Sequence, residues 1–223
     1  MKKFLFLTAV AVIGMSAKAQ ETRFGAKAGY SLSTLKQKDN SGSESSDPLH
    51  TFYVGGLVEH KISDKFGIQG EVLYSPLGGK VDESGAFEGD FSGDVRVKAK
   101  TTFGTLLIPV SAKYFITENL SVSGGASFGI ILSAKAKYEI TGNASIGDLG
   151  TEFGLGDNVD IKDQVNTLNI APFIGAEYML ENGLFFDARY NLGVSNLAKN
   201  TSDGEKLTNS FFQVGIGFKF GGN

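Results

Sequence analysis

The sequence predicts an all-β fold, an eight-stranded antiparallel up-and-down transmembrane β-barrel with short turns at one end and four long loops at the other. Three observations predict it: about eight segments alternate apolar and polar residues, long and short connections alternate along the chain, and the N-terminus reads as an export signal. The alternation is clearest in residues 211–220, where every second side chain is apolar. We expect these side chains to face lipid: Phe212, Val214, Ile216, Phe218 and Phe220.

The N-terminus has the pattern of a secretory signal peptide. Lys2 and Lys3 precede an apolar stretch over residues 4–15, and Ala17-Lys18-Ala19 matches the small-x-small cleavage pattern. A buried helix or a membrane anchor is the alternative, but the apolar run is shorter than the roughly 18 residues that a spanning helix requires. We therefore expect residues 1–19 to be a signal peptide and residues 20–223 to form one barrel domain.

The alternation places strands at about residues 22–34, 50–62, 66–76, 98–116, 120–140, 164–179, 184–194 and 211–220. Short connections fall at residues 63–65, 117–119 and 181–183, the last containing the hairpin-forming pair Asn182-Gly183. Long polar connections fall at residues 36–48, 77–97, 141–163 and 195–209. Short periplasmic turns and long outer loops are typical of bacterial membrane barrels.

A soluble exported β-sandwich or a lipocalin-like barrel is the alternative, with the apolar face turned inward. The polar face argues against it, because this face mixes large charged residues with many glycines and serines, which suits a small polar lumen. Aromatic residues near the strand ends also suit the girdles at the two membrane interfaces. They are Phe24, Phe52, Phe66, Tyr74, Tyr114, Tyr178, Phe186 and Phe220.

The inward positions carry both signs of charge. An eight-stranded barrel is filled by its own side chains, and an unpaired buried charge is expensive, so we expect a salt-bridged plug. Its expected members are Arg23, Lys27, Glu59, Lys61, Glu71, Lys113, Glu177, Asp187, Arg189 and Lys219. The alternative is a narrow proton or ion path lined by Glu59, Glu71, Lys113, Glu177 and Arg189. A general diffusion pore is excluded, because it needs about 16 strands.

Three segments carry a resemblance to a known family. They are residues 24–33 (FGAKAGYSLS), 106–115 (LLIPVSAKYF) and 214–220 (VGIGFKF). With them the chain resembles the outer-membrane β-barrel proteins of Bacteroidetes, the PorT-like group. The resemblance implies an outer-membrane location with outer-membrane lipid as a partner. Phe220 also resembles the aromatic-ended signal that barrel-assembly machinery reads, although Gly221-Gly222-Asn223 follow it here.

Composition excludes several kinds of chemistry. The chain has no cysteine, so disulfides, thiolate catalysis and cysteine metal sites are absent. Loss of Lys2, Lys3 and Lys18 with the signal takes the formal net charge from −3 to −6, which argues against nucleic acid as a partner. No cofactor or metal site is expected. Calcium binding by loop carboxylates stays open, although they lack the spacing of a calcium loop: Asp82, Glu83, Glu88, Asp90, Asp157, Asp160 and Asp163.

We expect no enzymatic activity. His50 and His60 are the two histidines, and no spacing gives either of them a nucleophile or a carboxylate partner. A rigid barrel with long loops most often binds through those loops. We therefore expect a role in adhesion or envelope organisation, or in an envelope assembly with a protein partner at the loops. A narrow channel or transport accessory is the first alternative, and an outer-membrane lipid-modifying enzyme that uses His60 is the second.

Overall fold

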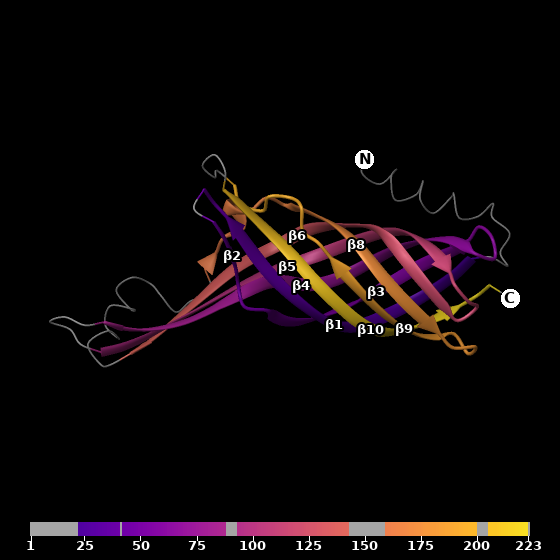
Figure 1. Cartoon of the computed structure of the whole chain (residues 1–223), viewed down its shortest axis with the longest axis horizontal. Helices are drawn as coiled ribbons and strands as arrows, with labels where there is room; N and C mark the ends of the chain where they lie inside the picture. Colours follow the sequence, from indigo (N-terminus) through magenta and orange to yellow (C-terminus); the bar gives the residue numbers. More distant parts are fainter. Residues whose placement is uncertain (1–21, 41, 88–92, 143–158, 200–204, 223) are drawn as a thin grey trace.

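The computed structural model describes residues 22–40, 42–87, 93–142, 159–199 and 205–222, and their main feature is a closed antiparallel barrel (Figure 1). Its eight long strands follow the order β10-β9-β8-β6-β5-β4-β3-β1, and β1 pairs back with β10. Their bounds are Thr22–Lys38 (β1), Leu49–Lys61 (β3), Phe66–Phe87 (β4), Gly93–Phe115 (β5), Leu120–Gly142 (β6), Leu168–Met179 (β8), Leu184–Asn191 (β9) and Lys206–Phe220 (β10). The predicted eight-stranded up-and-down barrel is confirmed.

Two short strands and one helical turn complete the described elements at the long-loop end. β2 (Ser43–Ser45) pairs with the end of β1, β7 (Val159–Asp160) pairs with β6, and η2 (Lys162–Gln164) is a single 3-10 turn. The start of β1, the end of β10 and the short turns lie at the opposite end of the barrel (Figure 1). Within the described ranges, no helix is long and apolar enough to cross a membrane.

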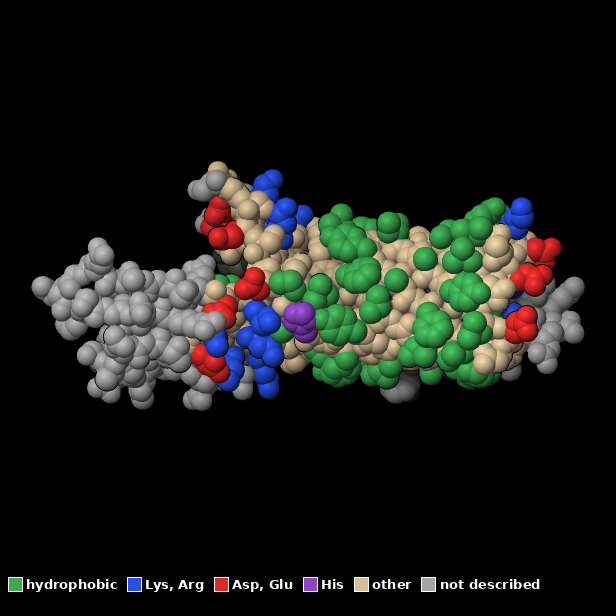
Figure 2. Space-filling view, turned by 60° about the horizontal axis from the view of Figure 1, so that its bottom comes forward, with side chains coloured by type: hydrophobic (Ala, Val, Ile, Leu, Met, Phe, Trp, Pro, Cys, Tyr) green, Lys and Arg blue, Asp and Glu red, His purple; other side chains and the backbone are tan. Residues whose placement is uncertain are grey.

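The barrel has a polar inside and an apolar outside. In β1, Lys27, Ser31 and Ser33 are buried, whereas Phe24 is 53% exposed and Tyr30 is 42% exposed. β10 repeats the pattern, since its Gln213 and Lys219 are buried and its five alternating apolar side chains are exposed. Hydrophobic side chains are spread along the barrel on the face that Figure 2 shows. An apolar outer wall around a polar interior would be unfavourable in water. The soluble alternative is therefore wrong, and the outer wall faces lipid.

Aromatic pairs stand toward both ends of this wall. At the short-turn end the ring centroids of Phe24 and Phe220 are 6.4 Å apart, and Phe66 and Tyr114 meet at 5.2 Å. Toward the long-loop end, Phe52 and Tyr74 are 6.3 Å apart. Each pair joins neighbouring strands on their outer face, and rings at these levels suit the two interfaces of a bilayer.

One predicted loop is wrong. Residues 77–97 are polar, yet β4 runs on to Phe87 and β5 begins at Gly93, with pairing that continues from Leu77↔Phe103 to Phe87↔Gly93. β6 accompanies them to Gly142, as its alternation predicted. The prediction failed because backbone pairing with β5 holds residues 78–87 as a strand, although their sequence shows no regular apolar alternation. Residues 78–87, 93–104 and 133–142 form a three-stranded sheet, here called the blade, that projects from the barrel (Figure 1).

Other strand boundaries also shift. β10 begins at Lys206 rather than 211, because residues 206–210 pair with the outer end of β1. β8 begins at Leu168 rather than 164, because residues 162–164 form η2, and β9 ends at Asn191 rather than 194. The predicted loop at residues 36–48 contains β2, and most of the loop at residues 141–163 lies outside the described residues.

Gly215 tests whether the narrow lumen tolerates extra volume. A Cβ at this position would meet the Tyr53 hydroxyl and would lie 2.7 Å from the carbonyl oxygen of Ala28. We expect Gly215→Ala to destabilise the barrel by about 1–3 kcal/mol through overpacking. The midpoint for thermal loss of the folded form, seen as the fast-migrating band of unboiled samples, measures this. Gly124→Ala is the matched control, because a Cβ there meets nothing within 4 Å; equal midpoints would contradict the packed lumen.

Candidate functional site

A ring of four charged side chains spans the barrel interior near the short-turn end. Glu59 of β3, Lys113 of β5, Glu177 of β8 and Lys219 of β10 each come from a different strand and are buried. The Lys113 Nζ lies 2.5 Å from Glu59 Oε2 and 2.8 Å from Glu177 Oε1. The Lys219 Nζ lies 2.7 Å and 2.5 Å from the same two oxygens. Each ammonium therefore bridges both carboxylates.

A second group forms around β9. Lys27 Nζ lies 2.8 Å from Asp187 Oδ2 and 3.2 Å from Glu71 Oε2. The Arg189 guanidinium donates to Glu71 Oε1 at 2.5 Å and lies 3.6 Å from Asp187. Tyr53 donates its hydroxyl to the other Asp187 oxygen at 3.1 Å. All five side chains are buried, and the four charged ones are two cations paired with two carboxylates.

Gln69 joins the two groups into one network. Its amide donates to Glu71 Oε1 at 2.7 Å, and its carbonyl oxygen accepts a bond from Lys113 at 3.2 Å. The joined network, called the interior network below, contains four cations and four carboxylates. Its net charge is therefore zero, and it presents no excess of either sign to a passing ion.

Two of the ten predicted charges lie at the edge of this network. Arg23 is 3.8 Å from Glu59, and its side chain is 23% exposed at the short-turn rim. Lys61 is partly exposed, and its Nζ lies 4.7 Å above the Phe115 ring. The structure brings the other eight together. Sequence reasoning missed Tyr53 and Gln69 as members, because a count of inward charges passes over neutral hydrogen-bonding side chains.

Apolar side chains fill the barrel beyond the interior network. Tyr53, Leu73, Leu77, Leu107, Ala171 and Phe211 form one buried cluster. Nearer the long loops, Asn209 donates to Ser33 at 2.9 Å, and a second cluster follows. That cluster consists of Phe103, Ile131, Ala134, Val165 and Leu197. A bridge between Val165 and Ala198 holds two connecting segments across the mouth. The described part of the lumen is therefore occupied from end to end.

The outer mouth carries a hollow of about 520 Å³, here called the cup. Its floor is apolar, with Leu35, Phe103, Ile161, Val165 and Leu207. Its rim is mostly polar and comes from β1, β2 with the two residues after it, β4 and β5: Gln37, Glu44, Ser45, Ser46, Asp47, Lys80, Val81, Asp82 and Thr101. An apolar floor beneath a polar rim suits a small ligand or side chain with both characters.

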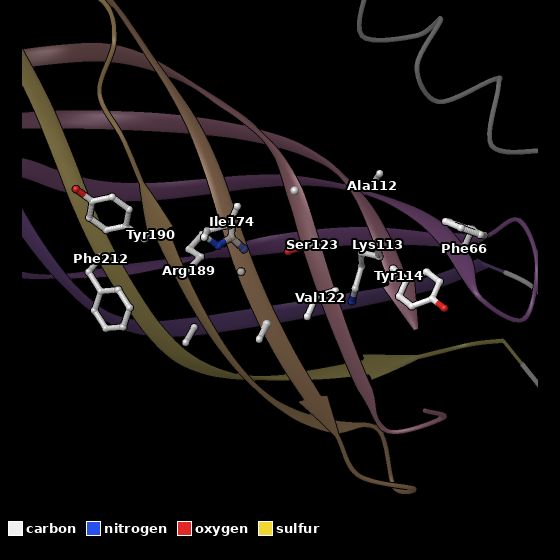
Figure 3. Close-up of a pocket in the computed structure, with 14 residues that line it drawn as sticks. Phe66, Ala112, Lys113, Tyr114, Val122, Ser123, Ile174, Arg189, Tyr190 and Phe212 are labelled. Carbon is white, nitrogen blue, oxygen red and sulfur yellow. The ribbon is translucent and has the colours of Figure 1, made fainter. Parts of the chain in front are cut away.

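A second hollow, of about 700 Å³, lies on the lipid-facing wall across β5, β6, β8 and β9 (Figure 3). It exists because the outward residues there are small: Ala112, Gly124, Ala176 and Ala188. Tyr190 and Phe212 border one end, and Phe66 and Tyr114 border the other (Figure 3). Lys113 and Arg189 also border it, but their charged groups belong to the interior network. The hollow is a dip in a wall that lipid covers.

The described residues contain no group of three or more His, Cys, Asp or Glu side chains that could hold a metal ion. Asp160 accepts a bond from the Lys162 backbone at 2.8 Å. Glu88, Asp90 and Asp157 lie outside the described residues, as does the side chain of Glu83.

The two histidines contact hydroxyl groups. His60 Nδ1 lies 2.9 Å from Thr22 Oγ1, and His50 forms a hydrogen bond with Tyr30. Neither contact adds the carboxylate that would orient a histidine as a general base.

A family model described as the outer membrane protein beta-barrel domain matches residues 18–199. The chain belongs to this family, and the protein is an outer-membrane β-barrel; the short-turn end is thus periplasmic and the blade extracellular. The narrower PorT-like assignment stays a prediction. No curated protein matches the chain significantly.

Three solved structures illustrate what the chain is similar to. Ail, the attachment invasion locus protein of Yersinia pestis, is 16% identical with a TM-score of 0.46, covering 90% of this chain and 99% of Ail. Neisserial surface protein A is 14% identical, with a TM-score of 0.40 and coverage of 88% and 97%. OprG of Pseudomonas aeruginosa is 13% identical, with a TM-score of 0.40 and coverage of 90% and 97%.

Glu59 is the most informative residue of the interior network to change. Glu59→Gln would leave Lys113 and Lys219 sharing Glu177 alone, with one buried positive charge in excess. We expect a loss of about 3–5 kcal/mol of stability, as for other broken buried pairs. Thermal loss of the folded form in an uncharged detergent measures it.

Glu139→Gln is the matched control for this substitution. It removes the same charge from an exposed pair with Lys137 on the blade, and we expect no measurable change. If both variants kept the wild-type midpoint, the interior network would not stabilise the barrel.

Proposed function

We propose that the protein acts at the cell surface through its extracellular end, the blade and the cup. Its role is adhesion or envelope organisation, alone or as a subunit of an envelope assembly with a protein partner. The observation that carries this proposal is the occupied, charge-neutral lumen. Since the described residues leave no open route through the barrel, the surfaces that can meet a partner are the outer ones.

The geometry of the lumen argues against the narrow channel. The residues that would line an ion path, among them Glu71 and Arg189, already pair with one another at 2.5–2.8 Å. A passing ion would have to separate buried partners, and breaking such a pair costs about 3–5 kcal/mol. Beyond them, the ion would meet the two apolar clusters.

The blade supports a binding role. Its strands continue the barrel hairpins, so the surface that they present is held by backbone hydrogen bonds. Its edges are partly protected: Asp47 bridges to Lys80 beside β4, and β7 pairs with Lys135 and Ala136 of β6. Covered edges disfavour the addition of a strand from a partner protein. We therefore expect the side chains of the blade to make the contacts with a partner.

Two further partners are proposed for the barrel itself. Outer-membrane lipid covers the exposed apolar wall. Barrel-assembly machinery would read the end of β10, where Phe220 is 58% exposed on the outer face and pairs with Phe24 once the barrel closes. Among the described hydrogen bonds, the two histidines contact hydroxyl groups and no carboxylate. These contacts support a non-enzymatic role.

Planar bilayers test the closed lumen. We expect the wild-type protein to show no discrete conductance steps in 1 M KCl. A variant with Glu59→Ala, Lys113→Ala, Glu177→Ala and Lys219→Ala opens the ring without changing net charge and serves as the comparison. Discrete steps in the wild type that change with Glu71→Gln would instead support the ion-path alternative.

Photo-crosslinking in intact cells tests the extracellular role. A benzoylphenylalanine at Thr101, which lines the cup, should capture a partner from the outer surface. The matched position is Lys65, an exposed residue in the periplasmic turn between β3 and β4. Adducts from Lys65 and none from Thr101 would place the partner in the periplasm and contradict the proposal.

A further inference from the structure

Three lysines stand side by side on adjacent strands of the blade. Lys80 of β4 is directly opposite Lys100 of β5, and Lys100 is directly opposite Lys137 of β6. We call these three residues the lysine ladder. Residues directly opposite each other in antiparallel strands have Cβ atoms about 4.5–5.5 Å apart, so three positive side chains share one small area.

The lysine ladder lies on the outer wall. The neighbouring Gly79 faces inward, because a Cβ there would meet the Ser46 side chain and would lie 3.2 Å from Leu35 Cγ in the cup. Alternation along β4 then turns Lys80 outward. Lys100 and Lys137 are exposed, as are the adjacent Lys98 and Lys135.

This patch carries a positive excess. Five lysines lie on it, and the nearby carboxylates are those of Asp47, Asp82 and Glu139. Lys137 Nζ pairs with Glu139 Oε1 at 2.7 Å, and the five lysines outnumber these three carboxylates. Like charges directly opposite across strands are destabilising in water, so the lysine ladder reduces stability unless an anion lies between its members.

The position of the patch indicates where that anion comes from. Four of the five lysines border a hollow of about 480 Å³ together with Pro48 and His50: Lys80, Lys98, Lys100 and Lys137. His50 is bonded to Tyr30, whose ring belongs to the outer wall toward the long-loop end. Figure 2 shows Lys and Arg side chains directly beyond the hydrophobic belt at the end that carries the blade. This is the level of the outer-leaflet headgroups.

We propose that the lysine ladder binds the phosphate groups of anionic lipids in the outer leaflet. Lysine is a compact cation suited to phosphate, and three from a rigid sheet need little ordering to meet one headgroup. A soluble polyanion has the same chemistry, but the adjacent apolar wall brings lipid headgroups to the ladder permanently. The inference goes beyond the proposed function, since it concerns lipid contacts of the outer wall, although Lys80 also borders the cup.

The test uses the full-length protein purified from membranes in an uncharged detergent. Short-chain phosphatidic acid is titrated against phosphatidylcholine of the same chain length, with binding read by native mass spectrometry. The variant carries Lys80→Gln, Lys100→Gln and Lys137→Gln. The matched control carries Lys36→Gln, Lys65→Gln and Lys199→Gln, three exposed lysines on separate segments that remove the same charge. Heat-modifiable migration verifies that both variants fold.

The wild type and the control should prefer phosphatidic acid, and the ladder variant should bind it about 100-fold more weakly, since each lysine near an anionic surface contributes about fivefold. Equal losses in both variants would show general charge attraction and overturn the proposal. Inositol hexakisphosphate provides the remaining comparison: if it binds the ladder more tightly than phosphatidic acid does and displaces it, the ligand is a soluble polyanion and the lipid assignment is wrong.

Discussion

The pairing of buried charges inside a narrow barrel is the constraint on which the rest of the structure depends. Eight strands leave room for side chains and little else, so every inward charge must find its partner on another strand. Lys113 and Lys219 do so by bridging Glu59 and Glu177, and four strands are thereby tied across the lumen. These contacts can form only when the strands have this register and the ring is closed. They also bring the net charge of the interior network to zero.

The pairing of charges inside the barrel allows its outer face to be apolar and to contact the membrane. Because the charged groups pair inside the barrel, the outer wall can be apolar over its whole middle and aromatic at its margins, as the lipid environment requires. The same filled interior moves any binding function to the extracellular end. There β4, β5 and β6 extend beyond the barrel as the blade. The cup lies toward its inner side, and the positive patch lies on its outer side.

Sequence alone predicted the barrel, its inverted polarity and most inward charges, because a period of two assigns each side chain to a face once a strand is recognised. It failed at residues 78–87 and 93–97, where apolar alternation is weak and backbone pairing rather than composition holds the strands. The sequence alone also could not show which of the inward charges contact one another. Glu59 and Lys113 lie on strands that are not neighbours, and their contact depends on how the ring closes. The lysine ladder was missed for the same reason, since register aligns Lys80, Lys100 and Lys137.

Solvent access to the lumen is the most direct test of a closed barrel that works at its surface. The chain has no cysteine, so single cysteines can report on chosen positions. Ser127→Cys places a thiol in the lumen, where Ser127 is 1% exposed and donates to Asn191, and Thr101→Cys places one in the cup. A small charged methanethiosulfonate should modify the cup thiol quickly and leave the lumen thiol unreacted in the folded protein. Comparable rates at both positions would reveal a water-filled path and contradict the account.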